Sequence, residues 1–153
     1  MKANCTLQLF ANGAWCDVGS VSLLGTEAQG WRSKTYTGYS VEWAIEHGKA
    51  RDAHAFACRF PVGLQEFEHP HWPVFLIDML PQGFGREELL RKLGLSTTAG
   101  ETVDWRLLLA GAGNSVGNLR VKEAASWLAA NAGPLRGFTD DEVAERGDDF
   151  AEF

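Results

Sequence analysis

The chain has 153 residues, of which 45% are apolar, and this length fits one ordinary globular domain. Its net charge of −6 comes from residues 138–153, which hold seven acidic residues and one arginine, whereas residues 1–137 hold thirteen charges of each sign. Without a basic cluster, the composition argues against direct nucleic-acid binding. No apolar run suggests a signal peptide or a membrane span, so we expect a cytoplasmic protein.

Strand patterns dominate the first sixty residues. An apolar run at 6–10 stops at Asn12-Gly13, a pair that tolerates two positive φ angles and predicts a tight hairpin. We expect the return strand over 15–24 and a third strand or bent pair over 35–43, which is rich in β-branched and aromatic residues. Alternation over 54–60 predicts a fourth, half-buried strand.

Helical periodicity begins after residue 71. The sequence predicts helices over 72–79, 85–93, 102–110 and 122–131, with a short strand at 119–121. A capping box at 139–142 predicts one more helix, which has a start signal and no stop signal. This leaves open a frayed acidic terminus or the front part of a longer protein. The fold class is therefore α+β, a small N-terminal antiparallel sheet or partial barrel with a cluster of three to five helices.

The stretch 107–121 raises the question of a nucleotide site, because Gly111, Gly113 and Gly117 lie close together around Ser115. No lysine follows at Walker spacing, and the glycine spacing is one residue too long for a dinucleotide fingerprint. The preceding helix would also present carbonyls to a phosphate. We expect instead a helix C-cap at Gly111 or Gly113, with Gly117 allowing close backbone approach.

A second candidate site is the corner around His69 and His71, which could be imagined as a metal cluster. Pro70 between the two histidines splays them, and no further ligand pair completes the set. A turn is therefore the preferred interpretation, and neither Ser96 nor Ser115 has a triad partner that the sequence can identify. The prediction is that the chain holds no catalytic, cofactor-binding or metal-binding residue. The other residues considered for the corner were Glu66, Glu68 and His54.

Two segments resemble the N-terminal region of HipA-like serine/threonine kinase toxins. They are residues 75–82, FLIDMLPQ, and residues 113–119, GNSVGNL. The resemblance covers roughly residues 5–121, and the chain departs from the usual pattern at Asn114 and Asn118. It implies a HipA-like N-terminal domain over 1–121 and, over 122–153, a helical extension with an acidic tail that connects to a kinase portion outside this chain.

The resemblance also implies a bacterial toxin–antitoxin setting. This chain would be a regulatory and scaffolding part, inactive alone, of a kinase that binds ATP and Mg²⁺ elsewhere and phosphorylates a protein. Its partners would be the kinase portion and a DNA-binding antitoxin. Two alternatives remain: a stand-alone split-toxin partner that acts as antitoxin or kinase inhibitor, and a small metal-dependent enzyme using Glu68, His69 and His71.

Overall fold

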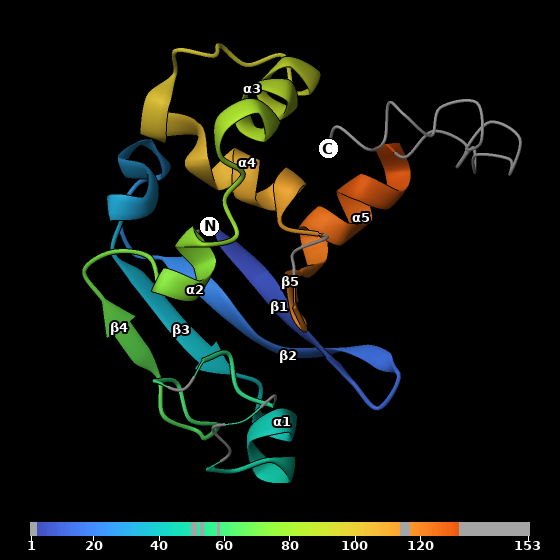
Figure 1. Cartoon of the computed structure of the whole chain (residues 1–153). Coiled ribbons are helices and arrows are strands. Elements are labelled where there is room, and N and C mark those ends of the chain that lie inside the picture. Colours follow the sequence, from blue (N-terminus) through green and yellow to red (C-terminus); the bar gives the residue numbers. More distant parts are fainter. Residues whose placement is uncertain (1–2, 50–51, 53, 58, 114–116, 132–153) are drawn as a thin grey trace, which may run out of the picture.

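One open antiparallel sheet organises the protein. The computed structural model describes residues 3–49, 52, 54–57, 59–113 and 117–131 (Figure 1). Its five strands are ordered β4-β3-β2-β1-β5, and they are β1 (Asn4–Ala11), β2 (Ala14–Leu23), β3 (Thr35–Tyr39), β4 (Phe67–His69) and β5 (Leu119–Val121). The predicted α+β class is confirmed, and the sheet takes the open form.

Helices and short 3₁₀ segments cover this sheet. They are η1 (Glu27–Arg32), α1 (Val41–Glu46), α2 (Val74–Ile77), α3 (Gly83–Lys92), η2 (Gly100–Val103), α4 (Asp104–Gly111) and α5 (Lys122–Asn131). Figure 1 shows α3, α4 and α5 gathered at one end of the molecule and α1 at the opposite end. None of the helices described is long and apolar enough to span a membrane.

The β1–β2 hairpin forms where the sequence predicts it. Asn12 and Gly13 have φ angles of 52° and 80°, so both loop residues take the left-handed conformation of a two-residue turn. Ala11 therefore pairs directly with Ala14, and the register continues to Asn4 opposite Ser22 with one shift between Leu7 and Gln8. The local twist of this turn matches that of the strands.

The predicted third strand, 35–43, is too long. It stops at Tyr39 because the Ser40 side chain accepts a hydrogen bond from the backbone N–H of Trp43, at 3.3 Å, and so caps α1. A serine cap satisfies a donor that the helix itself leaves unpaired. Capping here outweighs the strand propensity of the aromatic and β-branched residues around it.

The predicted strand over 54–60 is wrong for the residues described there, which form turns and bends. The hydroxyl of Tyr39 accepts a hydrogen bond from the Phe56 N–H at 2.9 Å and donates one to the Phe60 carbonyl. These contacts replace the ladder bonds that a strand would make. Ala55 and Phe56 are neighbours in the chain and both are buried, as is Phe60, so the alternation of the sequence does not mark two faces of a strand. The fourth strand is instead β4, which the sequence analysis missed.

The predicted helix over 72–79 is reduced to the four residues of α2. Trp72 precedes it and donates its backbone N–H to the Trp31 carbonyl at 2.9 Å, while Pro73 takes an extended ψ of 143°, so the helix starts only at Val74. Beyond Ile77, the N–H of Met79 donates to the Leu76 carbonyl, only three residues back, and the α-helical pattern ends. Trp72 and Leu76 are fully buried, while Phe75 and Met79 pack against the core at half burial. These four side chains therefore belong to the core or pack against it, although the helix in this segment is shorter than predicted.

The remaining elements follow the sequence closely. α3 and α5 lie over the predicted ranges within two residues, and β5 occupies the predicted short strand. The predicted helix at 102–110 divides into η2 and α4 at Asp104, whose side chain is buried. The capping box at 139–142 lies outside the described residues.

The core lies between the sheet and the helices. Its centre includes Trp72 and Trp105, whose rings meet edge to face with centroids 5.7 Å apart. Glu123, in the first turn of α5, accepts hydrogen bonds from the backbone N–H and the hydroxyl of Thr6, which fixes α5 to β1. Cys5 is also buried here, and its burial raises the pKa of the thiol, whereas Cys16 is half-buried.

Candidate functional site

The glycine stretch serves backbone packing. The C-cap of α4 is Ala112, with φ −87°, so the predicted caps at Gly111 and Gly113 are wrong. Gly113 is the point of close approach, since a Cβ added there would lie 2.5 Å from the backbone nitrogen of Ala125. Gly117, predicted for that role, has open space around it and supplies a φ of +113°. Asn114, Ser115 and Val116 lie outside the described residues.

The described part of this stretch does not fit a nucleotide phosphate. The space beside Gly113 is occupied by the backbone of Ala124 and Ala125. The end of α4 presents carbonyls, and the carbonyl of Ala112 accepts a hydrogen bond from the Val121 N–H at 3.0 Å. A phosphate needs the opposite polarity, a cradle of N–H groups. The permissive backbone thus lets α5 and β5 pack closely against α4.

The residues of the corner that was considered for a metal site are separated in the structure. The rings of His69 and His71 lie 6.3 Å apart, between centroids, and Glu68 is turned away to pair with Lys34. Neighbouring strand residues point to opposite faces, which explains the separation of Glu68 from His69. Over the residues that the structure describes, no three His, Cys, Asp or Glu side chains come together to hold a metal ion. The metal-enzyme alternative therefore lacks a site among them.

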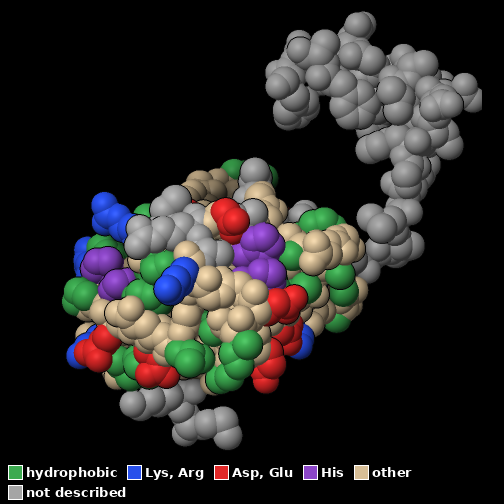
Figure 2. All heavy atoms as spheres, turned by 90° about the horizontal axis from the view of Figure 1, so that it is seen from below, with side chains coloured by type: hydrophobic (Ala, Val, Ile, Leu, Met, Phe, Trp, Pro, Cys, Tyr) green, Lys and Arg blue, Asp and Glu red, His purple; other side chains and the backbone are tan. Residues whose placement is uncertain are grey.

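His54 belongs to a different cluster. Its ring stacks on His47 with centroids 4.4 Å apart, and His47 in turn packs against Trp43. The backbone N–H of His54 and its Nδ1 both approach Asp52 Oδ1, at 2.9 and 2.8 Å. These hydrogen bonds, the backbone one first, lower the pKa of the exposed Asp52 carboxyl. Figure 2 shows histidine side chains in two separate groups on the face seen from below.

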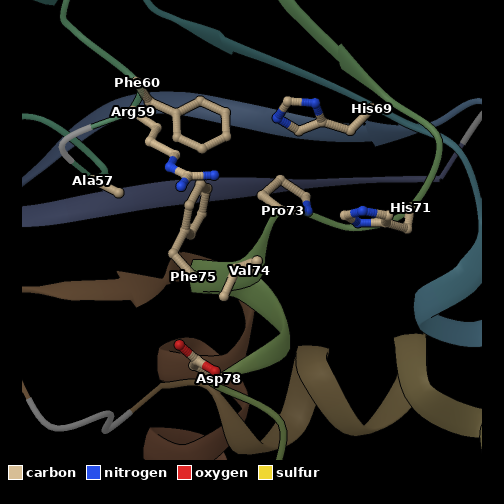
Figure 3. Close-up of a pocket in the computed structure, with 9 residues that line it drawn as sticks. All are labelled: Ala57, Arg59, Phe60, His69, His71, Pro73, Val74, Phe75 and Asp78. Atoms are coloured by element: carbon tan, nitrogen blue, oxygen red, sulfur yellow. The ribbon is translucent and has the colours of Figure 1, made fainter.

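An open cleft lies beside His69 and His71, and we call it the aromatic cleft (Figure 3). Its volume is about 510 Å³. Phe60 packs edge to face against Phe75 and against His69, with centroids 5.3 and 5.2 Å apart, and these rings form an apolar wall. The residues that line the cleft are Ala57, Arg59, Phe60, His69, His71, Pro73, Val74, Phe75 and Asp78.

Hydrogen bonds from the sheet hold the cleft in place. The hydroxyl of Thr35, on β3, donates to the His71 carbonyl at 2.8 Å. Nδ1 of His71 lies 2.6 Å from the Trp72 carbonyl, and because a carbonyl only accepts, Nδ1 is the donor. Arg59 lies at one end of the cleft and Asp78 at the other (Figure 3).

This arrangement is suited to binding. Aromatic and proline surfaces offer an apolar wall, while Arg59 supplies donors and positive charge at one end of the cleft and Asp78 a carboxyl group at the other. Among the described residues that line the cleft, none carries a hydroxyl or thiol that could act as a nucleophile. The chemistry matches an apolar side chain with a neighbouring acidic group, as on a protein surface. The sequence analysis weighed His69 and His71 as metal ligands and missed Arg59 and Asp78, which no local pattern marks.

A second hollow, the leucine groove, lies between α3, α4 and α5 and has a volume of about 320 Å³. Its walls come from three separate segments between Leu93 and Trp127, so no local sequence pattern predicted it. The lining residues are Leu93, Leu95, Arg106, Leu109, Ala110 and Trp127.

Comparison with known families gives one match. The sequence model described as the HipA N-terminal domain matches residues 21–122, from within β2 to the first residue of α5. The matched span contains every residue of the aromatic cleft. The comparisons with curated proteins and with solved structures gave no match.

Proposed function

Because the chain belongs to the HipA N-terminal domain family, we propose that it is the regulatory and scaffolding part of a HipA-like serine/threonine kinase toxin. It acts by docking onto the kinase portion and performs no catalytic step alone. The observation that carries this proposal is the family match over 21–122, two thirds of the chain. In this proposal, ATP and Mg²⁺ bind to the kinase portion.

The aromatic cleft is the docking surface in this proposal. Val74 stands on its edge with 64% of its surface exposed, next to the rings of Phe60 and Phe75. An exposed aliphatic side chain beside an aromatic wall is the composition typical of the centre of a protein interface. Arg59 and the two histidines would then meet acidic or carbonyl groups of the kinase portion at the rim.

The DNA-binding antitoxin is the second partner in this proposal. Residues 1–137 carry thirteen basic and thirteen acidic side chains, so this part offers no net charge to a phosphate backbone. In this proposal the antitoxin therefore makes the contacts with DNA. The chain contributes a protein surface to the assembly.

Co-purification with the kinase portion tests the docking. That portion is encoded either in the same reading frame or by a neighbouring gene, and the second arrangement identifies the split-toxin alternative. We expect Val74→Asp to weaken binding by about tenfold or more, the loss typical of a hot-spot residue. Calorimetric titration measures the change in affinity.

Val41→Asp is the matched control. Val41 is also a valine at the first position of a short helix, with 56% of its surface exposed, but it lies on α1 outside the cleft. An aspartate is equally compatible with both helix starts. Equal losses at the two valines would remove the cleft from the interface, and no association at micromolar concentration would reject the docking itself.

A further inference from the structure

The leucine groove is an apolar surface with a basic edge. Leu93, Leu95 and Leu109 are each half-buried and form its walls together with Trp127. Arg106 lines the groove from α4, is exposed, and makes no ion pair with any residue that the structure describes. An unpaired guanidinium beside apolar side chains favours an occupant that is both apolar and acidic.

Other charges on α3 strengthen this edge. Lys92 is exposed and directly precedes Leu93. Arg91 is exposed as well, but it pairs with Glu88 at 3.3 Å and Glu87 at 3.9 Å within its own helix. Among the described residues that line the groove, the positive charge therefore comes from Arg106, and Lys92 adds an exposed charge next to Leu93 in the chain.

The chain leaves α5 beside this groove. Asn131, the last residue of α5, donates from Nδ2 to the Trp127 carbonyl at 2.8 Å. Residues four apart lie on the same side of a helix, so the following residues start about one turn from Trp127. The 22 residues from 132 to 153 could extend about 70 Å, far more than is needed to cross the groove.

The acidic segment, residues 138–153, has the matching chemistry. It carries seven acidic residues, one arginine and three phenylalanines. Phe150 follows two aspartates, Asp148 and Asp149, and precedes Glu152 by two positions. An apolar ring flanked by carboxylates is the complement of leucine walls beside a guanidinium.

We propose that the acidic segment binds in the leucine groove of its own chain. Phe150 occupies the space between the leucines and Trp127, and the neighbouring carboxylates face Arg106 and Lys92. Covalent attachment gives a high effective concentration, so weak contacts are enough to hold the segment. The inference concerns the chain alone and holds whether or not the aromatic cleft docks a kinase.

Disulfide trapping in the full chain tests this. Ser96→Cys lies next to Leu95, and Ala151→Cys lies next to Phe150, so both sites are close to the contact without removing it. With Cys16 and Cys58 replaced by serine, we expect this pair to form an intrachain disulfide about tenfold or more faster than a control pair, because docking raises the local concentration. The control pair combines Ala151→Cys with Ser20→Cys, an exposed serine on β2.

Charge changes sharpen the test. Arg106→Glu should slow the trapping of the Ser96/Ala151 pair to the control rate, and about 1 M salt should slow it too because the Debye length falls to about 3 Å. Arg59→Glu makes the same charge change in the aromatic cleft and should leave the rate unchanged. Equal rates for the two cysteine pairs would overturn the proposal, as would no effect of Arg106→Glu. Disulfide-linked dimers would assign the groove to a second copy and also reject it.

Discussion

Tyr39 fixes the loop that supplies one wall of the aromatic cleft. Its hydroxyl bonds to the backbone of both Phe56 and Phe60, and its ring stacks on Phe56 with centroids 4.0 Å apart. Burial raises the pKa of Tyr39 to about 12, while the hydrogen bond from the Phe56 N–H opposes the shift. A single phenol therefore joins β3 to a segment without regular structure.

The raised pKa of Tyr39 predicts a loss of stability at high pH. In the unfolded chain the Tyr39 hydroxyl loses its proton near pH 10. The stability that the protonated hydroxyl gives to the fold is therefore complete below pH 10 and disappears as the pH rises to about 12. In Tyr36→Phe, which leaves Tyr39 as the one tyrosine, the phenolate absorbance of the native protein should rise only near pH 12.

Tyr39→Phe provides the comparison. It should lower the free energy of unfolding by about 1–3 kcal/mol because the Phe56 N–H loses its acceptor. The difference in the free energy of unfolding between this variant and the wild type, measured by urea unfolding, should become smaller from pH 10 to pH 12. Native absorbance that titrates near pH 10 would show that the hydroxyl is not held as described.

At the scale of elements, the sequence correctly predicted those helices and turns that depend on residues close together in the chain. The Asn12-Gly13 hairpin, α3 and α5 form where turn chemistry and periodicity place them. Two errors came where other hydrogen bonds replaced the predicted ones. At 54–60 the Tyr39 hydroxyl bonds to the backbone in place of a strand ladder. Beyond α2 the N–H groups of Met79 and Leu80 bond only three residues back, so the helix predicted over 72–79 does not continue.

The close contact between Gly113, which follows α4, and the backbone of α5 can be tested by substitution. Gly113→Ala would bring a Cβ to 2.5 Å from the Ala125 nitrogen, and α5 must shift to relieve the contact. We expect a loss of about 1–3 kcal/mol in the free energy of unfolding, typical of overpacking. Chemical denaturation followed by tryptophan fluorescence measures it.

Gly85→Ala is the matched control for that substitution. Gly85 lies inside α3, and nothing stands within 4 Å of an added Cβ. The change should stabilise the protein by about 0.5–1 kcal/mol, since alanine loses less backbone freedom in a helix. If both substitutions changed the free energy of unfolding in the same direction, the contact at Gly113 would not limit the packing of α5.

At the scale of the whole molecule, Asp104 joins elements from three parts of the chain. Its carboxylate accepts hydrogen bonds from the Trp31 N–H at 3.2 Å and from Arg86 at 2.8 Å, and only 1% of the residue is exposed. Arg86 also donates to the Gly100 carbonyl at 2.7 Å. η1, α3 and α4 thus meet at one buried carboxylate.

Removing one partner of this pair should be costly. Arg86→Ala leaves the buried Asp104 without its counter-ion, and we expect a loss of about 3 kcal/mol in the free energy of unfolding. Arg91→Ala, on the same helix, breaks two exposed ion pairs and should cost less than about 0.5 kcal/mol. Thermal or urea unfolding of both variants gives the comparison, and similar losses would rule out a special role for Asp104.

Both candidate sites are formed by segments that are distant in the sequence, which explains why the sequence predicted so few of their residues. His69 and His71 drew attention as neighbours in the chain, but the aromatic cleft also needs Arg59 and Phe60 from a loop that was predicted as a strand. The leucine groove needs α3, α4 and α5 together. Neither constellation exists until the long-range contacts have formed.

The pairing of β1 with β5 has a consequence for synthesis. Leu7 lies opposite Val121, so one edge of β1 has unpaired backbone groups until residue 121 has left the ribosome. During that interval this edge can pair with a strand from another nascent chain. Premature termination before Leu119 would make this exposure permanent, and the truncated product should accumulate as aggregates.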